Sequence, residues 1–251
     1  MTTSLEYASE NGTTIIMDTR SCQTLGIHSL SSEWFESEYW QNNNAITGQA
    51  SGRGSTLFVR WQDVDLIMRH YCRGGAIRHI SKDKYVFGGL QRTRAWRELA
   101  LLQHMNNLKL PVPQGVGARV QRDAFFYRAD LLCLRIPHAK DIHQLLVSKP
   151  LATSIWKKIG SAIRQLHNAQ VYHHDLNIRN IMLDSDEKVW IIDFDKCALK
   201  AGDKWKKGNL DRLHRSLLKE REKASQFHFD QREWQSLISG YSEYSEQFTA
   251  R

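Results

Sequence analysis

Two motifs in the second half of the chain combine the residue types that phosphoryl transfer requires. Residues 173–180 read His-His-Asp-Leu-Asn-Ile-Arg-Asn, which has the H-x-D-x-x-x-x-N spacing of a kinase catalytic loop. Residues 191–195 read Ile-Ile-Asp-Phe-Asp, an apolar run that delivers an aspartate and a phenylalanine. A single aspartate in a loop is most often a turn former or a helix cap. Two motifs in this order and at this spacing are instead typical of an enzyme that transfers phosphate from ATP.

Three side chains of these motifs match the tasks of that reaction. A carboxylate must accept the proton of the attacking hydroxyl, and Asp175 stands at that position. Oxygen ligands must hold Mg²⁺ on the phosphates of ATP, and Asn180 and Asp193 are the candidates. The apolar runs at 181–183 and 189–192 predict two short strands that hold both motifs in place. ATP and Mg²⁺ are therefore the predicted cofactors.

A glycine-rich segment upstream is the candidate cover for the phosphates. Residues 48–55 read Gly-Gln-Ala-Ser-Gly-Arg-Gly-Ser and precede a β-prone run. Because backbone amides of such a loop can contact phosphate oxygens, Gly52, Gly54 and Ser55 are assigned to nucleotide binding. Taken alone, the segment fits a plain hairpin better, since glycine-rich turns are common. The assignment therefore depends on the two motifs downstream.

The residue that grips the α- and β-phosphates departs from the usual kinase pattern. The strand position that carries lysine in most kinases carries Arg69 here, at the end of Leu-Ile-Met-Arg. Arginine can hold phosphate through its planar fork and can also pair with Glu98, which lies inside a predicted helix. An exposed helix glutamate without such a role is the alternative for Glu98. Lys82 and Lys84 are alternative phosphate ligands from the same basic stretch.

Further departures point away from a protein substrate. Asp195 occupies the position of the glycine that follows Asp-Phe in protein kinases. His174 replaces the arginine that commonly reads a phosphorylated activation loop. No Ala-Pro-Glu motif follows Asp195, and the residues after it are expected to be too few for a full peptide-binding lobe. The expected acceptor is therefore a small molecule or a glycolipid.

The elements around these residues form a strand-rich first half and a mainly helical second half. This division predicts an α+β, two-lobed protein-kinase-like fold with an N-terminal antiparallel sheet plus one helix, and with the active site in a cleft. Residues 1–136 are the predicted nucleotide-binding lobe, and residues 137–251 are the predicted catalytic and substrate lobe. Strands are predicted at 13–17 (at a sheet edge), 56–61, 64–71, 117–120 and 124–128, and helices at 33–40, 93–108 and 153–168.

Positive charge is distributed unevenly along a chain of otherwise ordinary globular composition. The net charge is +8, with 41% hydrophobic and 25% charged residues. Residues 69–97 carry eight Lys or Arg against one acidic residue, and residues 200–223 carry nine against four. Two such segments favour an anionic partner, which is a phosphorylated substrate, a nucleic acid or an acidic lipid. A solvated charged face is the alternative for each of them.

Several classes of protein are not expected. The four cysteines are scattered without a CxxC pair, which argues against a disulfide scaffold and a zinc site. No leader pattern and no run of roughly 18 apolar residues is present, so we expect a cytosolic protein or one on the cytosolic face of a membrane. Nucleic acid is not an expected partner, since no RNA-binding signature or basic zipper occurs. No protein partner is predicted.

The motifs together resemble a known family. The resemblance covers roughly residues 30–225. It is to the 3-deoxy-D-manno-octulosonic acid (Kdo) kinases, which belong with the heptose kinases of the lipopolysaccharide core in the protein-kinase-like superfamily. The catalytic loop is shared widely among kinases, whereas the arginine-rich run and the following helix start are more particular to this family. The matching segments are 69–75, 92–98, 110–113, 173–180 and 191–195.

The resemblance implies transfer of the γ-phosphate of ATP to the 4-hydroxyl of Kdo on a lipid A precursor. It also implies a peripheral protein at the cytoplasmic face of the inner membrane of a Gram-negative bacterium. Arginine at the strand-lysine position is similar to the habit of that family. Substrate phosphates and carboxylate, or an anionic membrane surface, are then candidate partners of the basic residues Arg73, Arg78, Lys82, Arg92 and Arg94, and of Lys204, Lys206 and Lys207 with Trp205.

Three other functions remain open at this point. A heptose kinase of the lipopolysaccharide core would share most of the motifs. A small-molecule kinase of the aminoglycoside or choline type would carry the same catalytic residues, but the two basic stretches argue against its cationic acceptors. A catalytically inactive pseudokinase is suggested by Arg69 and opposed by the intact Asp175, Asn180 and Asp193.

Overall fold

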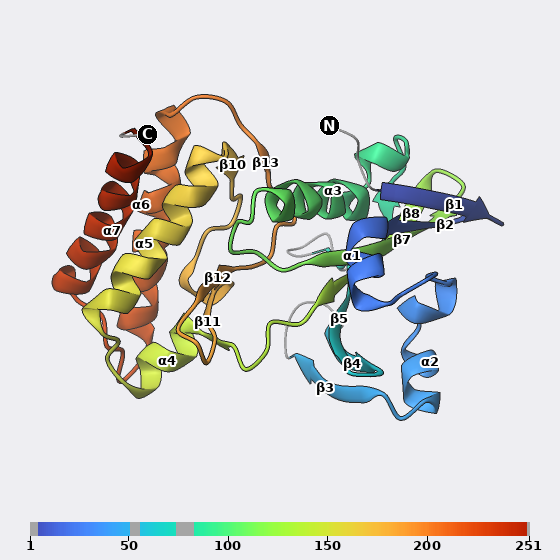
Figure 1. Cartoon of the computed structure of the whole chain (residues 1–251), viewed down its shortest axis with the longest axis horizontal. Helices are drawn as coiled ribbons and strands as arrows, with labels where there is room; N and C mark the ends of the chain where they lie inside the picture. Colours follow the sequence, from blue (N-terminus) through green and yellow to red (C-terminus); the bar gives the residue numbers. More distant parts are fainter. Residues whose placement is uncertain (1–4, 51–55, 74–82, 250–251) are drawn as a thin grey trace. The chain divides into compact units, whose positions relative to one another are not determined.

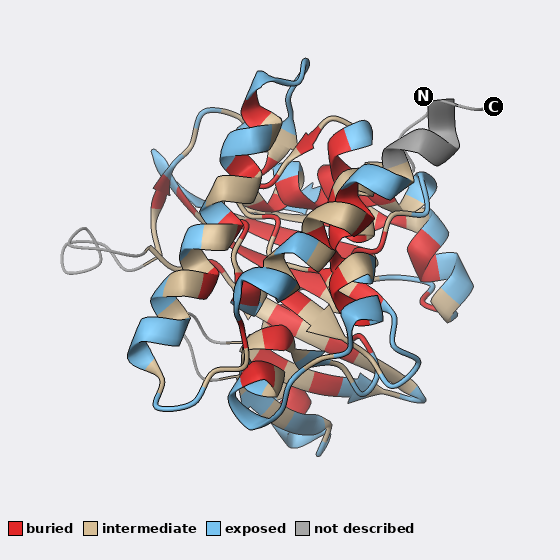
Figure 2. Ribbon diagram, turned by 90° about the vertical axis from the view of Figure 1, so that its left-hand side faces the viewer, coloured by how far each residue is buried: buried red, intermediate tan, exposed pale blue. Residues whose placement is uncertain are grey.

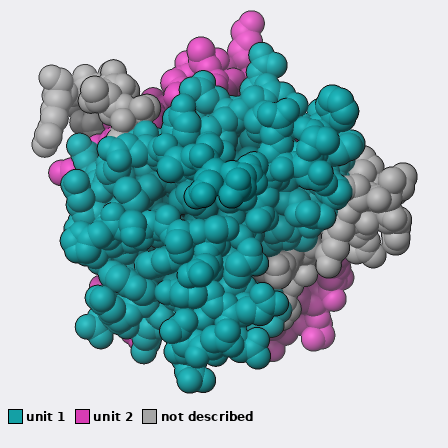
Figure 3. All heavy atoms as spheres, turned by 90° about the vertical axis from the view of Figure 1, so that its right-hand side faces the viewer, with its two compact units in different colours: residues 1–103, 114–135 teal, residues 104–113, 136–251 magenta. Residues whose placement is uncertain are grey.

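The computed structural model describes residues 5–50, 56–73 and 83–249, and the side chains up to residue 244. The fold is α+β, with no cis peptide bond among the described residues (Figure 1). Contacts group the chain into two compact units (Figure 3). Unit 1 comprises residues 1–103 and 114–135, and unit 2 comprises residues 104–113 and 136–251. Each unit is described by itself below.

Unit 1 is built around an antiparallel sheet. Its strand order is β1-β2-β7-β8-β5-β4-β3, and β6 pairs with β8 beyond the end of β5. Every pair is antiparallel, as predicted for the N-terminal sheet. The strands are β1 Leu5–Glu10, β2 Thr13–Asp18, β3 Ile46–Ala50, β4 Thr56–Trp61, β5 Val64–His70, β6 Tyr85–Val86, β7 Gly115–Asp123 and β8 Phe126–Leu134.

Alternating side chains place one face of β4 and β5 in a core. Leu57 and Val59 of β4 and Leu66 and Met68 of β5 are buried, while their neighbours in sequence are more exposed. They pack in one cluster with the aromatic residues of the segment before β3, including Trp40. Arg69 belongs to the alternate set on β5, so the strand directs it away from this cluster.

Helix α3 (Arg94–Asn107) confirms the helix predicted at 93–108. Thr93 accepts a hydrogen bond from the backbone N–H of Trp96 through its side-chain oxygen, which caps the helix start as its residue type predicts. Leu99, Leu102 and Met105 are fully buried and follow helical spacing. Glu98 is also buried and lies on this same face of the helix, near its start.

Unit 2 is mainly helical. The helices α5 and α7 lie side by side (Figure 1), and glycines allow the close approach. A Cβ at Gly160 would lie 2.0 Å from the carbonyl oxygen of Leu237, and one at Gly240 would lie 2.2 Å from that of Lys157. The elements are α4 Ile142–Ser148, α5 Thr153–Asn168, α6 Lys204–Lys223 and α7 Gln231–Thr249, with short strands β9 Lys140–Asp141, β10 Val171–Tyr172, β11 Ile181–Leu183, β12 Val189–Ile191 and β13 Ala198–Leu199.

Burial follows the predicted pattern on α5, whose bounds match the prediction at 153–168. Ile155, Ile159, Ile163 and Leu166 are all buried, as the apolar stripe predicted. Figure 2 shows buried residues gathered in the interior and exposed residues on the outer sides of the helices. None of the described helices is long and apolar enough to cross a lipid bilayer.

Three predictions about elements are wrong. The helix predicted at 33–40 is broken into a 3-10 turn (Ser32–Phe35) and α2 (Ser37–Asn42), because Glu36 is extended. The strand at 13–17 exists, but β1 pairs with its outer side, so β1 is the edge strand. The sequence did not predict β1, because five of its six side chains are exposed and show no apolar pattern. The strand predicted at 124–128 is β8, which begins at residue 126, since Ala124 has a φ of 50° in the hairpin turn, and which continues to Leu134.

Candidate active site

The loop 173–180 connects β10 to β11 and is closed by its own side chains. The backbone carbonyl of Asp175 accepts hydrogen bonds from the amide Nδ2 of Asn177 at 2.9 Å and from Nδ2 of Asn180 at 3.0 Å. The side-chain oxygen of Asn177 in turn accepts from the backbone N–H of Arg179. These bonds fix the path of the backbone around Asp175, whose half-exposed carboxylate projects from the loop.

The end of β12 is bonded to this loop. The backbone N–H of Ile192 donates to the carbonyl of Asn180 at 3.0 Å, which brings Asp193 next to the loop end. Asp193 has a φ of 65°, in the left-handed region. That conformation costs a residue other than glycine about 1–2 kcal/mol, and Asp is among the residue types that adopt it most readily.

The donor set at this place fits Mg²⁺. The amide Nδ2 of Asn180 is committed to the carbonyl of Asp175, so its oxygen atom points out of that bond. Asp193 adds a carboxylate. No group of three or more His, Cys, Asp or Glu side chains that could enclose a metal exists in the described part of the chain. Mg²⁺ fits such a sparse set, because it keeps several waters and takes further oxygens from substrate phosphates.

His173 holds the loop to the segment that follows β12. Its ring is buried, donates from Nε2 to the carbonyl of Ile192 at 3.0 Å, and packs edge-on against Phe194 at 5.0 Å between ring centres. Burial lowers the pKa of His173 and keeps the ring neutral near pH 7. The first histidine and the phenylalanine of the two motifs therefore have a structural role, and they join the two motifs.

Helix α6 contributes residues that the sequence analysis did not identify. Four polar side chains on one face contact the loop in register. Asn209 donates to the carbonyl of His173 at 2.7 Å, and Arg212 contacts the Asp175 carboxylate through Nε at 3.1 Å and also through Nη2. Further along, Ser216 accepts from the N–H of Ile178, and Glu220 accepts from Arg179. Their spacing is helical, but charged α6 residues cover all faces, so the sequence alone does not single them out.

Asp175 is held in its ionised form. Burial raises the pKa of its carboxyl, but the hydrogen bond and the positive charge of Arg212 outweigh that effect. The pKa of Asp175 is therefore lowered from its ordinary value. An ionised carboxylate with access to solvent is able to accept a proton from a hydroxyl group.

A buried network backs Asn209. Its side-chain oxygen lies 3.1 Å from Nε2 of His167, and Nδ1 of that ring lies 2.8 Å from the hydroxyl of Tyr241. The amide of Asn209 donates to the loop, so its oxygen is the acceptor and Nε2 of His167 carries the proton. Nδ1 then accepts from the tyrosine. Helices α5, α6 and α7 are thus joined to the loop through one neutral histidine.

This histidine predicts a stability that depends on pH. Burial lowers the pKa of His167 to about 4, whereas an unfolded chain has a histidine pKa near 6.5. The unfolded state binds more protons between these values, so stability falls as pH falls from 6.5 to 4, by up to about 3 kcal/mol. We expect His167→Gln to flatten this slope in urea unfolding at several pH values. An unchanged slope would contradict the assignment, and exposed His28→Gln is the control.

Unit 1 brings together the predicted pair Arg69 and Glu98. Nη2 of Arg69 lies 2.5 Å from Oε2 of Glu98, and the Glu98 side chain is only 4% exposed. The hydroxyl of Tyr71 donates to the same oxygen at 2.7 Å, and the guanidinium lies 4.9 Å from the Tyr71 ring. A buried carboxylate with two donors is a well-satisfied ion pair. Tyr71 was missed because an aromatic residue at a strand end predicts only packing.

The alternative phosphate ligands differ in their surroundings. Nζ of Lys84 lies 3.1 Å from the carboxylate of Asp123, and its carbonyl accepts from Arg73. Lys82 lies outside the described residues, as do Gly52, Gly54 and Ser55 of the predicted glycine loop. Gly48, at the start of that segment, belongs to β3.

Some predicted anion-binding residues are engaged within the protein. Arg73 and Arg94 both stack on Tyr85, whose hydroxyl also accepts from Arg94 at 2.7 Å. The expectation that Trp205 lies at a membrane interface is wrong. Its ring is buried against His167 and donates to the carbonyl of Lys200 at 2.9 Å. The indole N–H is therefore satisfied inside unit 2.

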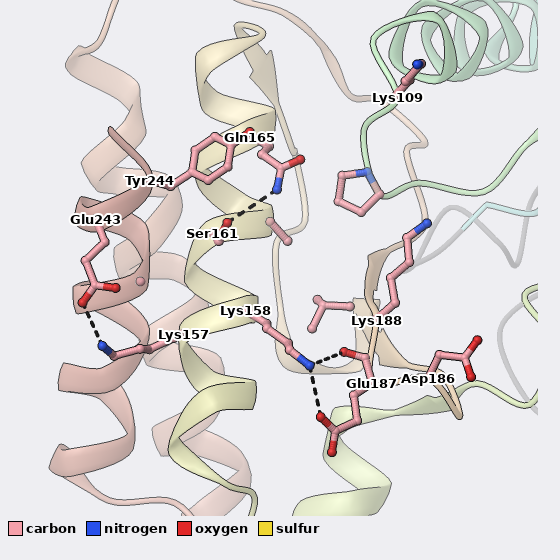
Figure 4. A pocket seen from close by; sticks show the side chains of 14 residues that line it. Lys109, Lys157, Lys158, Ser161, Gln165, Asp186, Glu187, Lys188, Glu243 and Tyr244 are labelled. Atoms are coloured by element: carbon pink, nitrogen blue, oxygen red, sulfur yellow. Dashed lines mark hydrogen bonds and ion pairs between the residues drawn. The ribbon is translucent and has the colours of Figure 1, made fainter. Parts of the chain in front are cut away.

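A hollow of about 550 Å³ on unit 2 is lined by other residues. Figure 4 shows it between α5, α7 and the turn after β11, with no lining residue from the loop 173–180. Lys157 pairs with Glu243 at 2.8 Å, and Lys158 pairs with Glu187 at 3.0 Å. Acidic partners neutralise these two lysines, and Lys109 and Lys188 also line the hollow.

Comparison with known proteins identifies the family. The model of the lipopolysaccharide kinase (Kdo/WaaP) family matches residues 37–241. A protein of Vibrio cholerae named 3-deoxy-D-manno-octulosonic acid kinase is 45% identical over 194 residues, which cover 77% of this chain and 83% of the relative. A protein of the same name from Mannheimia succiniciproducens is 46% identical over 215 residues, 83% of this chain and 89% of the relative. The chain belongs to the lipopolysaccharide kinase (Kdo/WaaP) family.

Proposed function

We propose that this protein transfers the γ-phosphate of ATP to a hydroxyl of Kdo, carried on a lipid A precursor, in the synthesis of the bacterial lipopolysaccharide core. The observation that carries the proposal is the loop 173–180, which presents an ionised Asp175 beside Asn180, with Asp193 next to the end of the loop. Relatives at 45% and 46% identity bear the name of a kinase for this sugar acid. The 4-hydroxyl is the acceptor by resemblance to the family.

Each site residue has a proposed task. Asp175 accepts the proton of the sugar hydroxyl and orients that hydroxyl toward the phosphate. Asn180 and Asp193 hold Mg²⁺, which supplies positive charge to the phosphate oxygens when it is bound. Arg69, oriented by Glu98, contacts the phosphates of ATP through its planar guanidinium. Gly52, Gly54 and Ser55 cover the phosphates in this proposal.

In this proposal the first and second parts of the chain bind different substrates. Residues 1–136 bind the nucleotide, and residues 137–251 carry the catalytic loop and bind the sugar. The placement of Arg69 and Glu98 in unit 1 and of Asp175 in unit 2 supports this proposal, while residues 104–113 group with unit 2.

The test is transfer of labelled phosphate from ATP and Mg²⁺ to two lipids that differ in one group. One is a Kdo-bearing lipid A precursor and the other is the same precursor without Kdo. Label on the first lipid alone is the expected result. Equal label on both lipids would move the acceptor to the lipid A part, and label on a heptose-bearing core alone would favour a heptose kinase. Label on none of them would contradict the proposal.

We also propose that the protein works at an anionic membrane surface. The tip of the hairpin that joins β7 to β8 exposes Phe125 (80%), and Val86 of the adjacent strand β6 is 71% exposed. Val86 pairs with Phe126 across the strands, so both lie on one face. Arg122 lies over Phe87 at 4.7 Å and adds positive charge beside them. An apolar tip with adjacent cations is suited to the headgroup region of an acidic bilayer.

Substitution of the tip tests this proposal. Burying a phenylalanine in the membrane interface contributes roughly 1.5–3 kcal/mol, so Phe125→Ser should weaken binding to anionic vesicles about tenfold or more. Co-sedimentation with vesicles that contain acidic phospholipid measures the effect. The matched control is Val147→Ser in α4, which removes another exposed apolar side chain. Equal loss in both variants, or in neither, would contradict a specific role of the hairpin.

A further inference from the structure

Arg212 carries more hydrogen-bonding capacity than its contact with Asp175 uses. Its Nε and Nη2 atoms both donate to a single oxygen of that carboxylate, Oδ1. A guanidinium has five N–H donors, and Nη1 of Arg212 makes no hydrogen bond to any described residue. The two side chains are 46% and 49% exposed, so the remaining donors face solvent next to the proposed base. The planar fork of arginine matches a carboxylate better than any other side chain does.

One turn before Arg212, the surface of α6 carries no side chain, because the residue there is a glycine. Gly208 lies one turn before Arg212 in α6, on the side toward which helix side chains lean. Glycine inside a helix is destabilising relative to alanine, so its presence there needs a physical reason. For Gly160 and Gly240 the reason is a neighbouring helix backbone, which a Cβ would meet within 2.2 Å. Apart from its two chain neighbours and the backbone of α6 itself, no described atom lies within 4 Å of a Cβ built at Gly208.

We propose that Arg212, with the open helix surface at Gly208, forms a subsite for the carboxylate of the sugar acid. This inference rests on the proposed function. The acceptor hydroxyl must come within hydrogen-bond reach of Asp175, and Arg212 touches that same side chain. An octulosonic acid carries its carboxylate only a few bonds from its ring hydroxyls. The carboxylate of the substrate would therefore lie next to the unused N–H donors of Arg212.

The subsite gives the enzyme a way to select its substrate. A neutral sugar in the same pose would leave the donors of Arg212 without an anionic partner. Hydrogen bonds to charged groups contribute about 1.5–3 kcal/mol, which is roughly a 10- to 150-fold preference for the acid. On the side of α6 that meets the loop, Asn209 and Ser216 are already bonded to the loop backbone, so Arg212 is the cation of that side in contact with Asp175.

The test compares two acceptors: the Kdo-bearing lipid A precursor and the same lipid with the Kdo carboxylate converted to a carboxamide. The wild type should lose about 10- to 150-fold in kcat/KM on the carboxamide, mainly through KM. Arg212→Gln should lower kcat on both lipids, because Asp175 loses its charge partner, and should also abolish the preference in KM for the acid over the carboxamide. The control is Arg221→Gln, which removes an exposed arginine from the opposite face of α6 and should keep the preference.

A second variant tests the open surface without touching charge. Gly208→Leu should raise KM for the acid, because the side chain fills the space beside Arg212, whereas Gly208→Ala should have a much smaller effect. Both changes replace glycine in a helix, so Tm should stay equal or rise. A normal KM in Gly208→Leu would contradict the use of this surface.

The outcomes separate the inference from the proposed function. An Arg212→Gln enzyme that still prefers the acid by the wild-type factor would overturn the subsite. A kcat lowered on both lipids with the KM preference for the acid intact would assign Arg212 to positioning Asp175 alone, and would also overturn it. A wild type that phosphorylates neither lipid would instead contradict the proposed function, and the inference would fall with it.

Discussion

Asp175→Asn should lower phosphate transfer to the Kdo lipid by about 10²- to 10⁴-fold while the protein still binds ATP with Mg²⁺. The amide has nearly the shape of the carboxylate, so the loop bonds at the backbone carbonyl of residue 175 are kept. What is lost is the acceptor for the proton of the sugar hydroxyl and the charge partner of Arg212. Single-turnover transfer and nucleotide titration measure the two properties separately.

The matched control for this change is Asp186→Asn. Asp186 is an exposed aspartate in the turn between β11 and β12, and it lies in the same unit as Asp175. Its turnover should equal that of the wild type. Normal transfer by Asp175→Asn would remove this residue as the base. Loss of ATP binding in the same variant would mean that the change had disturbed the fold of the loop.

Much of the fold follows from local patterns. The bounds of α5 were predicted to the residue, and those of α3 within one residue, because both have a long apolar stripe. The segment 33–40 was wrongly predicted as one helix, because its sequence from before Trp34 to Trp40 is amphipathic. The indole N–H of Trp40 instead donates to the carbonyl of Trp34 at 2.8 Å, and this bond accompanies a break in the helix. A tertiary bond of this kind has no signature in the spacing of residues.

The candidate site divides in the same way. The residues of the loop could be assigned from the sequence because their types and intervals are set by the chemistry. Arg212 and Asn209 could not, because they reach the loop from a helix that begins more than twenty residues later. Only the folded chain shows which turn of α6 meets which loop residue. Tyr71 escaped for the same reason, since its bond to Glu98 joins a strand end to a helix.

Asp193→Asn should leave binding of ATP without metal unchanged and weaken binding of ATP with Mg²⁺. The variant keeps the size of the side chain but removes the negative charge from the proposed magnesium ligands. Loss of an outer-shell partner of a metal costs roughly 10- to 100-fold in affinity or activity, so loss of a direct ligand should cost at least as much. The Mg²⁺ concentration for half-maximal transfer should rise accordingly. Titration of Mg²⁺ at fixed ATP measures this shift.

The backbone at this position sharpens the test. Asp193 has a φ of 65°, and asparagine tolerates the left-handed region at least as well as aspartate does. The substitution therefore adds no backbone strain, and a changed Mg²⁺ requirement reports the carboxylate itself. Asp186→Asn again serves as the control, since it removes an aspartate from the same unit at a turn. An unchanged Mg²⁺ dependence in Asp193→Asn would remove the residue from the metal site. A raised Mg²⁺ requirement in Asp193→Asn but not in the control would support Asp193 as a ligand, with Asn180 as its partner. The amide oxygen of Asn180 lies at the loop end to which β12 is bonded.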